Sequence, residues 1–521
     1  MLKSYIVSRR VLFRNLLSNW GGLAADLMVA FFLTPFIVSS LGMVTYGIWS
    51  LVNSVIGYLG LIDMGIRGSV GRYINHYMAR DDAERVNEVI STSLFFLTLM
   101  CLIVFGISYL IAFNFDSLFS KTPRDLLGVL RIVLPLMAFN LWLTFVSSIY
   151  RSVIAALDRF EVLNAVSIFV LGLRTAGVVL VLRLGHGLLG LAIVATVANV
   201  VSGIVFMISA SRLYTELHSS LEHVNRERFS EMWKFGIASF VTRIASQFVY
   251  ESGSIITMIL LGPTMVAVYS IGTMLVQYGQ NVMEQIGGTL FPSIMKAGSV
   301  RDISGLQHIF VLYGRLAFFF GVLVYMGFVV FGRHFIELWV GPSFRQAAVV
   351  LAILSVSELL SHLGRIGGSI LFSLDKIRYN VVCSVCEVGA NILLTVIFVG
   401  VFHLGIKGIA LGVLVPRVGV LGFAYSLYTA KVLAMSYRDY IVRTGGKAAL
   451  VTIVSFILFS LLLKQMIITG WKSFFIQITI AAIAYFPIAA FLMFKREDLI
   501  QSLKKAGSIL RLSVASLHVK D

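Results

Sequence analysis

Apolar stretches of about twenty residues alternate with short polar loops along the whole chain. This is the length that a helix needs to cross the hydrocarbon core of a bilayer. The pattern therefore predicts an all-α polytopic membrane protein with about fourteen transmembrane helices. The predicted spans are residues 17–38, 46–66, 88–112, 126–150, 162–182, 187–210, 234–260, 265–292, 306–332, 347–370, 380–402, 407–430, 447–468 and 473–494.

The first twelve predicted spans look like one six-helix unit that is used twice. Short motifs recur at an almost constant offset of about 220 residues. The matching positions are Leu41-Gly42 with Leu261-Gly262, Ser50 with Ser270, Tyr58 with Tyr278, Asp82 with Asp302, Leu157-Asp158-Arg159 with Leu374-Asp375-Lys376, and Gly187 with Gly405. Two such bundles with a site between them are typical of secondary transporters. We expect an N-lobe at residues 1–216, a C-lobe at residues 217–435, and two further helices with a cytoplasmic amphipathic tail at residues 436–521.

A segment rich in charged and polar residues, 211–233, joins the two lobes. Its mixture of apolar and charged positions predicts an amphipathic helix that lies on the inner membrane surface. The other loops are short throughout. They leave no room for a soluble catalytic domain, so we predict a transporter without catalytic residues and not an enzyme.

Composition supports the membrane assignment, because 58% of the residues are hydrophobic, 13% are charged, and the mean hydropathy is +0.92. The formal net charge of +17 would also suit a nucleic-acid-binding protein. Most Lys and Arg residues, however, fall on one side of the predicted topology, together with both termini. Because positive residues concentrate on the cytoplasmic side of membrane proteins, both termini are predicted to be cytoplasmic. We expect contact with anionic lipids and no nucleic acid among the partners.

The cysteines and histidines indicate no metal or redox chemistry. Cys383 and Cys386 have the spacing of a redox motif, but they lie among valines within a predicted span. We interpret them as small packing residues. Most histidines are scattered over loops and span ends, and no glycine-rich loop precedes a Lys-Ser or Lys-Thr pair. The sequence therefore predicts no metal site, no cofactor and no ATP hydrolysis.

Charged residues fall inside the predicted spans, where each costs roughly 2.5–3.5 kcal/mol if it faces lipid. Ten of them are Arg174, Arg243, Arg315, Arg365, Arg417, Asp26, Glu251, Glu284, Glu358 and Glu387. Several lie on polar stripes of helical spacing, such as Glu358, His362 and Arg365. One interpretation is that the arginines and acids pair and hold the helices together. The other is that the long stripes line a water-filled vestibule, which their continuity favours.

A cationic vestibule open to the cytoplasm suits an anionic cargo, and arginine is the residue that binds phosphate with two parallel hydrogen bonds. The candidate residues for an anionic headgroup are Arg174, Arg243, Arg315, Arg365, Arg417, Gln247, Gln277 and Asn391. An acid near arginine can also exchange a proton or bind Na⁺ and so couple transport to an ion gradient. The candidates for ion coupling are Asp26, Glu251, Glu358, Glu387 and His362.

Four stretches resemble a known family. They are LGMVTYGIWSLVNSVIGYLGLIDMG at Leu41–Gly65, RYINHYMARDDAERVNEVISTS at Arg72–Ser93, ALDRFEVLN at Ala156–Asn164 and ELWVGPSFRQAAVVLAIL at Glu337–Leu354. Together they resemble the polysaccharide-transporter branch of the multidrug/oligosaccharidyl-lipid/polysaccharide flippase superfamily, which includes the O-antigen and exopolysaccharide flippases. No motif in these stretches fixes an individual ligand residue, so the arginines match the cationic cavity of that family only in character.

The resemblance implies two six-helix lobes, two additional helices and a location in the bacterial inner membrane. It implies a flippase that moves undecaprenyl-diphosphate-linked oligosaccharide from the cytoplasmic to the periplasmic leaflet by alternating access, driven by H⁺ or Na⁺. Polysaccharide polymerase and chain-length proteins are candidate protein partners. Two alternatives stay open: an exporter of small amphipathic molecules, as in the drug antiporters of the same superfamily, and a membrane polysaccharide polymerase or ligase.

Overall fold

The computed structural model describes residues 9–494, except for the side chains of residues 9–20, 23, 238–239, 241–246, 249–250 and 377. The predicted cytoplasmic tail thus lies largely outside the described residues. The described part of the chain consists of helices joined by short loops, without a β-strand. Ten of its helical segments are long and apolar enough to cross a membrane, and two further apolar helices are shorter. The predicted all-α polytopic fold is confirmed, and a count of fourteen spans is compatible with these helices.

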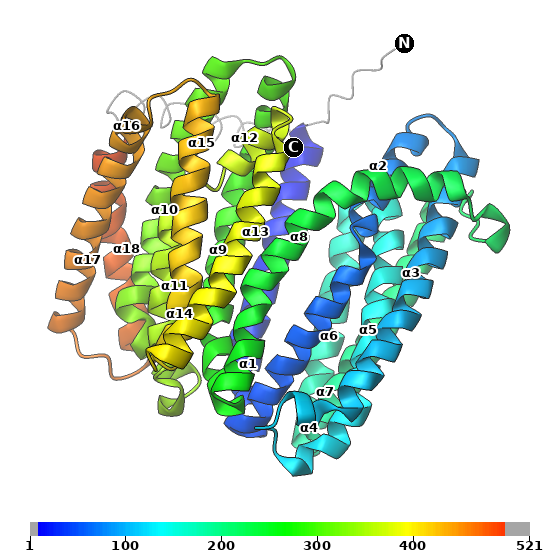
Figure 1. Cartoon of the computed structure of the whole chain (residues 1–521), viewed down its shortest axis with the longest axis horizontal. Coiled ribbons are helices and arrows are strands. Elements are labelled where there is room, and N and C mark those ends of the chain that lie inside the picture. Colours follow the sequence, from blue (N-terminus) through cyan, green and yellow to red (C-terminus); the bar gives the residue numbers. More distant parts are fainter. Residues whose placement is uncertain (1–8, 495–521) are drawn as a thin grey trace, which may run out of the picture. The chain divides into compact units, whose positions relative to one another are not determined.

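Contacts divide the chain into two compact units, Met1–Ser270 and Ile271–Asp521. In the first unit, α5 packs between α3 and α7, and α6 packs against both α7 and α1 (Figure 1). Helix α8 packs on α1 and α2. The helices of this unit are α1 (Arg9–Leu59), α2 (Ile66–Met78), α3 (Ala83–Phe113), α4 (Phe115–Leu118), α5 (Arg124–Ala156), α6 (Phe160–Arg183), α7 (Gly187–Leu213) and α8 (Arg226–Leu260).

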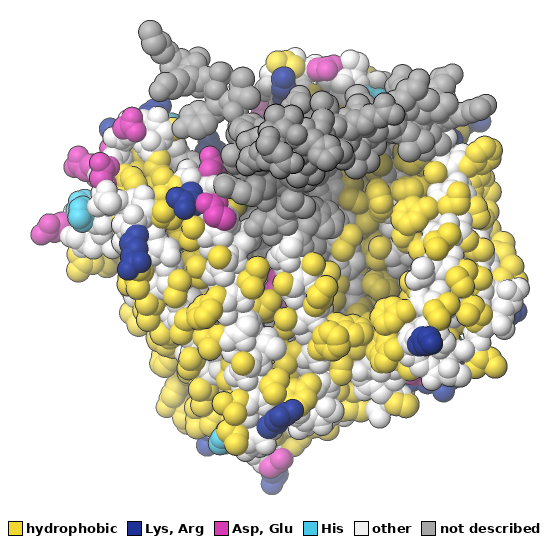
Figure 2. Space-filling model, turned by 180° about the vertical axis from the view of Figure 1, so that it is seen from behind, with side chains coloured by type: hydrophobic (Ala, Val, Ile, Leu, Met, Phe, Trp, Pro, Cys, Tyr) yellow, Lys and Arg dark blue, Asp and Glu magenta, His cyan; other side chains and the backbone are white. Residues whose placement is uncertain are grey.

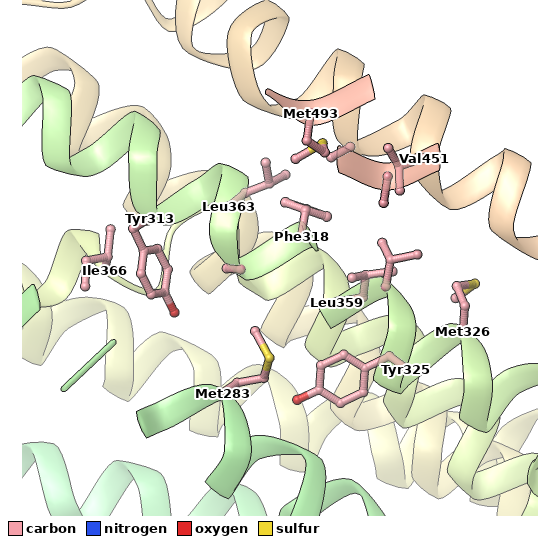
Figure 3. Packing of buried hydrophobic residues seen from close by; sticks show 14 of the residues in the cluster. Met283, Tyr313, Phe318, Tyr325, Met326, Leu359, Leu363, Ile366, Val451 and Met493 are labelled. Carbon is pink, nitrogen blue, oxygen red and sulfur yellow. The ribbon is translucent and has the colours of Figure 1, made fainter. Parts of the chain in front are cut away.

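The core of the second unit forms where α10 packs against α11, α17 and α18. Figure 3 shows Phe318, Tyr325 and Leu359 among the buried side chains of this core. The helices are α9 (Pro263–Ser299), which begins in the first unit, α10 (Ile303–Trp339), α11 (Ala347–Ser361), α12 (Gly367–Ser373), α13 (Ile377–Val396), α14 (Ile406–Arg417), α15 (Tyr425–Val432), α16 (Tyr437–Tyr440), α17 (Lys447–Gln465) and α18 (Trp471–Met493). Three π-helical segments occur at Ile397–Val401, Val418–Ala424 and Ile441–Gly446.

The outer surface agrees with a bilayer environment. Figure 2 shows hydrophobic side chains over most of the described surface on one face, with few charged side chains among them. On α18, for example, Ile483 and Phe491 are 68% and 82% exposed. Large apolar side chains exposed in this number would be a liability in water, whereas lipid accommodates them.

Backbone geometry supports the internal repeat. Residues with positive φ, which mark sharp turns, recur at the positions that the sequence motifs match. The pairs are Gly42 (φ 73°) with Gly262 (94°), Asp81 (54°) with Arg301 (51°), Asp158 (55°) with Asp375 (59°), and Gly187 (52°) with Gly405 (55°). The next residues along the chain repeat a helix cap: Asp82 accepts a hydrogen bond from the N–H of Arg85, and Asp302 from that of Gly305. The backbone N–H of Gly305 and the hydroxyl of Ser304 also lower the pKa of the Asp302 carboxyl.

Gly42 joins the two spans of α1 with φ 73° and ψ 167°, a conformation that only glycine adopts easily. A Cβ added there would meet no atom within 4 Å, so Gly42→Ala tests the backbone alone. We expect this change to destabilise the protein by about 1–3 kcal/mol, measured as thermal unfolding of the purified protein in detergent. The matched control is Gly106→Ala in α3, where a Cβ also meets nothing and alanine should stabilise the helix by about 0.5–1 kcal/mol. Equal shifts in the two variants would contradict the argument.

The segment between the repeats differs from its prediction. Helix α7 ends at Leu213 and α8 begins at Arg226, with only one 3₁₀ turn, Leu221–His223, between them, so an amphipathic helix over residues 211–233 is wrong. The cause is that polar side chains of α3 accept hydrogen bonds from the backbone of this segment. The N–H groups of His218, Ser220 and Asn225 donate to Asn87 (3.0 Å), Ser91 (3.2 Å) and Thr92 (2.9 Å), respectively. These bonds give the three backbone N–H groups acceptors outside a helix, so the segment need not be helical.

Candidate functional site

A polar hollow of about 370 Å³ lies within the first unit, among α1, α5, α6 and α7. Its walls combine charged, carboxamide and hydroxyl side chains with a few apolar ones. A neighbouring hollow of about 230 Å³ shares Asp26, Arg151, Ser167 and Leu171 with it and extends the same space. Polar side chains at the depth of the membrane must face protein or water, so these hollows are suited to hold water or a polar ligand.

Two arginines line the larger hollow, Arg151 near the end of α5 and Arg174 in α6. Both side chains are exposed, and neither forms an ion pair with a carboxylate among the described residues. The guanidinium of Arg151 lies 5.1 Å from the ring centroid of Phe206, which holds it by a cation–π contact. The hollow therefore presents two guanidinium groups whose hydrogen-bond donors are available to an anion.

Asp26 in α1 also lines both hollows, and it is close enough to Arg174 for electrostatic attraction. It forms no ion pair with a described residue, and its side chain is exposed. Two positive groups and one negative group thus face the same space. An anionic ligand is favoured there, and the charge state of Asp26 modulates the attraction.

Carboxamides also line the hollow. Asn199 of α7 donates hydrogen bonds to Asn140 and, at 3.1 Å, to the hydroxyl of Thr144, both on α5. Asn53 of α1 donates to the carbonyl of Trp49, one turn earlier, at 2.8 Å. These bonds fix the orientation of the side chains and join two of the helices across the hollow.

The second unit holds a buried charge cluster at Glu358 in α11. One carboxylate oxygen of Glu358 lies 2.6 Å from Nε of Arg417, and the other accepts a hydrogen bond from Arg365. The side chains of Glu358 and Arg417 are 3% and 4% exposed. Glu387 is buried and attracted by Arg417 and Arg365. Here Glu358 pairs with two arginines, as the first interpretation of the sequence proposed, and the pair with Arg417 joins α11 and α14.

The chain is irregular around this cluster. Helix α11 ends at Ser361, and turns at residues 362–366 separate it from α12. The π-helical segment Val418–Ala424 directly follows Arg417 and packs against α11. His362 lies in the break, fully buried, and neither of its ring nitrogens has a hydrogen-bond partner in the part of the chain that the structure describes. Breaks and π-bulges of this kind are frequent at functional sites.

The remaining predicted residues lie apart from these two sites. The side chain of Arg243 is outside the described residues. Gln247 donates to Glu251 at 3.3 Å, and Glu251 also interacts with Ser54 across α1 and α8. Arg315 donates to the carbonyl of Arg443 at 3.4 Å. Gln277 is exposed on α9, and Asn391 is buried and donates to the carbonyl of Gly412 at 3.2 Å.

Sequence reasoning missed Arg151, Asn53 and Asn199. Arg151 stands one residue beyond the predicted span 126–150, which places it outside the membrane-crossing helix. The helical continuation of α5 to Ala156 places it at the hollow instead. The available signal was the spacing of Asn140, Thr144, Ser147 and Arg151, which continues one polar stripe. Among the described residues, no group of three or more His, Cys, Asp or Glu side chains could hold a metal ion.

Comparison with solved structures identifies the class of fold. The chain superimposes on the lipid II flippase MurJ in an inward closed conformation with a TM-score of 0.71, over 94% of this chain and 100% of that one, at 14% identity. It superimposes on an inward-facing multidrug resistance MATE family transporter of the MOP superfamily with a TM-score of 0.67, over 79% and 96% of the two chains, at 14% identity. The protein is therefore a multi-pass membrane protein with the fold of the multidrug/oligosaccharidyl-lipid/polysaccharide superfamily.

Sequence comparison identifies the family within this class. Residues 12–297 match the family described as polysaccharide biosynthesis protein, and the chain belongs to it. The uncharacterized membrane protein EpsK of Bacillus subtilis (strain 168) is 22% identical over 413 residues, which cover 76% of this chain and 79% of that protein. A putative O-antigen transporter of Shigella flexneri is 21% identical over 370 residues, which cover 70% and 85%. The resemblance seen in the sequence motifs is confirmed.

Proposed function

We propose that this protein is a flippase for undecaprenyl-diphosphate-linked oligosaccharide, the repeat unit of an O-antigen or exopolysaccharide. It moves this lipid from the cytoplasmic to the periplasmic leaflet of the inner membrane, with both of its own termini in the cytoplasm. The observation that carries the proposal is the hollow of the first unit, in which Arg151 and Arg174 are not paired with described carboxylates. A member of a polysaccharide biosynthesis family with such a site is suited to an anionic lipid-linked glycan.

The chemistry of the site favours a diphosphate. A guanidinium presents several donors in one plane and binds two phosphate oxygens at once. Two guanidinium groups facing one space match the two phosphate groups of a diphosphate. A neutral amphipathic molecule would leave the excess positive charge of the hollow, two arginines against Asp26, without compensation, which argues against the export of such molecules.

Transport follows from alternating access, in which the two lobes expose the headgroup site first to the cytoplasm and then to the periplasm. The driving force is an H⁺ or Na⁺ gradient. Asp26 in the hollow and Glu358 in the second unit are the groups proposed to exchange the ion, because each carboxylate interacts with arginine at membrane depth. Glu251, Glu387 and His362 are further candidates for this role. The arginines of the second unit contribute to coupling through their pairing with Glu358.

Asp26→Asn tests the role of the carboxylate beside Arg174. Removal of a negative charge from an anion site should tighten the binding of inorganic pyrophosphate by about 1 kcal/mol, or roughly fivefold. Transport driven by an imposed ion gradient should be lost in the same variant, because asparagine cannot exchange a proton. Binding is measured by calorimetry and transport in proteoliposomes. Asp116→Asn, at an exposed position in α4, is the control, and equal behaviour of the two variants would contradict the role of Asp26.

Deletion of the gene distinguishes the proposed function from its alternatives. A flippase mutant should accumulate lipid-linked repeat units on the cytoplasmic leaflet, where an impermeant glycosidase in right-side-out vesicles cannot reach them. Repeat units that are exported but not polymerised would indicate a polymerase or ligase instead. Normal surface polysaccharide together with hypersensitivity to amphipathic drugs would indicate a drug exporter. Restoration of export by the intact chain is the control.

A further inference from the structure

The hollow of the first unit combines charged and neutral polar side chains. The residues shared with the neighbouring hollow include both Asp26 and Arg151, so charged side chains continue into that space. The carboxamides Asn53, Asn140 and Asn199 line the larger hollow only, as Arg174 does. Neutral hydrogen-bonding groups therefore share one hollow with a guanidinium group.

The three carboxamides retain hydrogen-bonding capacity. The amide nitrogen of Asn199 is used by Asn140 and Thr144, but no described group donates to its carbonyl oxygen. The amide nitrogen of Asn140 has only the sulfur of Met137 as an acceptor, at 3.8 Å. The carbonyl oxygen of Asn53 likewise has no donor among the described residues. Both donors and acceptors are thus available, and their positions are fixed by existing hydrogen bonds.

An aromatic side chain lines the same hollow. Trp49 lines the hollow one helical turn before Asn53, and its other contacts are apolar, with the core between α1 and α6. A sugar ring presents hydroxyl groups, which are donors and acceptors together, around its edge, and C–H groups on its faces. Carboxamides beside an aromatic wall complement both features, whereas phosphate, which only accepts, would not use the free carbonyl oxygens.

We propose that Trp49, Asn53, Asn140 and Asn199 form a sugar subsite that binds the residue attached directly to the diphosphate, and that this subsite selects which lipid-linked glycans are accepted. The inference rests on the proposed function, because the arginines of the hollow must hold the diphosphate for the first sugar to reach the carboxamides.

Binding to the full-length protein in nanodiscs of phosphatidylethanolamine and phosphatidylglycerol tests the subsite. The probes are undecaprenyl diphosphate and the same lipid carrying one hexose or one N-acetylhexosamine. The unaltered protein should bind at least one sugar-bearing probe more tightly than the bare lipid. Asn199→Ala should weaken binding of that probe about tenfold and leave binding of the bare lipid unchanged.

Asn53→Ala is the second variant, because Asn53 bonds only to its own helix and its loss removes no bond between helices. We expect a loss of about threefold to tenfold for the same sugar-bearing probe. The matched control is Asn75→Ala in α2, where the side chain donates to the carbonyl of Gly71, four residues earlier, in the same geometry but away from the hollow. This control should bind all probes as the unaltered protein does.

The outcomes separate the subsite from the proposed function. If the Asn199 and Asn53 variants bind the bare and the sugar-bearing lipids with equally reduced affinity, or bind both with unchanged affinity, the sugar subsite is overturned while the diphosphate site stands. If the unaltered protein binds all probes equally, the subsite is overturned in the same way. If the unaltered protein binds none of them, the proposed function itself is overturned. Selective loss of the sugar-bearing probe supports both.

Discussion

Replacing Arg174 with alanine is expected to weaken binding of undecaprenyl diphosphate by about 1.5–3 kcal/mol, or roughly tenfold to 150-fold. The physical reason is the loss of a charge-assisted hydrogen bond in a site where Arg174 has no ion-pair partner among the described residues. Arg151→Ala should have an effect of similar size. The double variant should retain no measurable flipping in proteoliposomes and should fail to restore surface polysaccharide to a deletion strain.

Two controls separate this effect from general damage. Arg174→Lys retains the positive charge but not the planar guanidinium group that binds two phosphate oxygens at once. We therefore expect partial activity and a weaker preference for diphosphate over monophosphate. Arg159→Ala removes an exposed arginine that pairs with Glu161 outside the hollow, and it should leave transport unchanged. Unaltered flipping by the Arg151/Arg174 double variant, with normal insertion in the membrane, would exclude this hollow as the headgroup site.

The fold was largely predictable because membrane insertion imposes a simple length and polarity on each span. The recurrence of Gly42 at Gly262 and of Asp82 at Asp302 also carried structural information. Each glycine occupies a turn with positive φ, and each aspartate caps a helix. The linker at residues 211–233 was not predictable in the same way. Its conformation depends on side chains of α3 more than a hundred residues earlier in the chain. Such contacts cannot be predicted from the spacing of apolar and polar residues within the linker.

For the candidate sites, the sequence could predict which residues share a face of one helix, but not which helices contact one another. The spacing of Glu358 and Arg365 placed both on one face of a predicted helix, and the structure does bring them together. Arg417 of α14 also pairs with the Glu358 carboxylate. This contact depends on how α14 packs against α11, and the spacing of residues within one helix cannot predict it. The break after Ser361 is also tertiary in origin. The Tyr440 hydroxyl donates to the carbonyl of Leu363, and a side chain at Gly364 would collide with the carbonyl of Leu421.

The buried cluster of the second unit leads to the largest expected effect on stability. Glu358→Gln leaves two arginines in the interior without the carboxylate that they share, and we expect a loss of about 3–5 kcal/mol in the free energy of unfolding. Glutamine has nearly the same shape, so the effect reports charge and not packing. The measurement is thermal unfolding in detergent, followed by the fluorescence of the six tryptophans.

Glu337→Gln is the matched control, because Glu337 also forms ion pairs with two arginines, Arg333 at 2.9 Å and Arg345 at 3.5 Å. Its side chain is 28% exposed, and its partners are 50% and 60% exposed, so water replaces the lost carboxylate and the change should cost at most about 1 kcal/mol. Adding Arg417→Met to Glu358→Gln should restore part of the lost stability, since one uncompensated charge is removed. If both glutamine variants unfold at the same temperature, the Glu358 cluster is open to water. Its arginines would then be free to bind an anion, as the vestibule interpretation of the sequence requires, and the assignment of the headgroup to the first unit alone would be wrong.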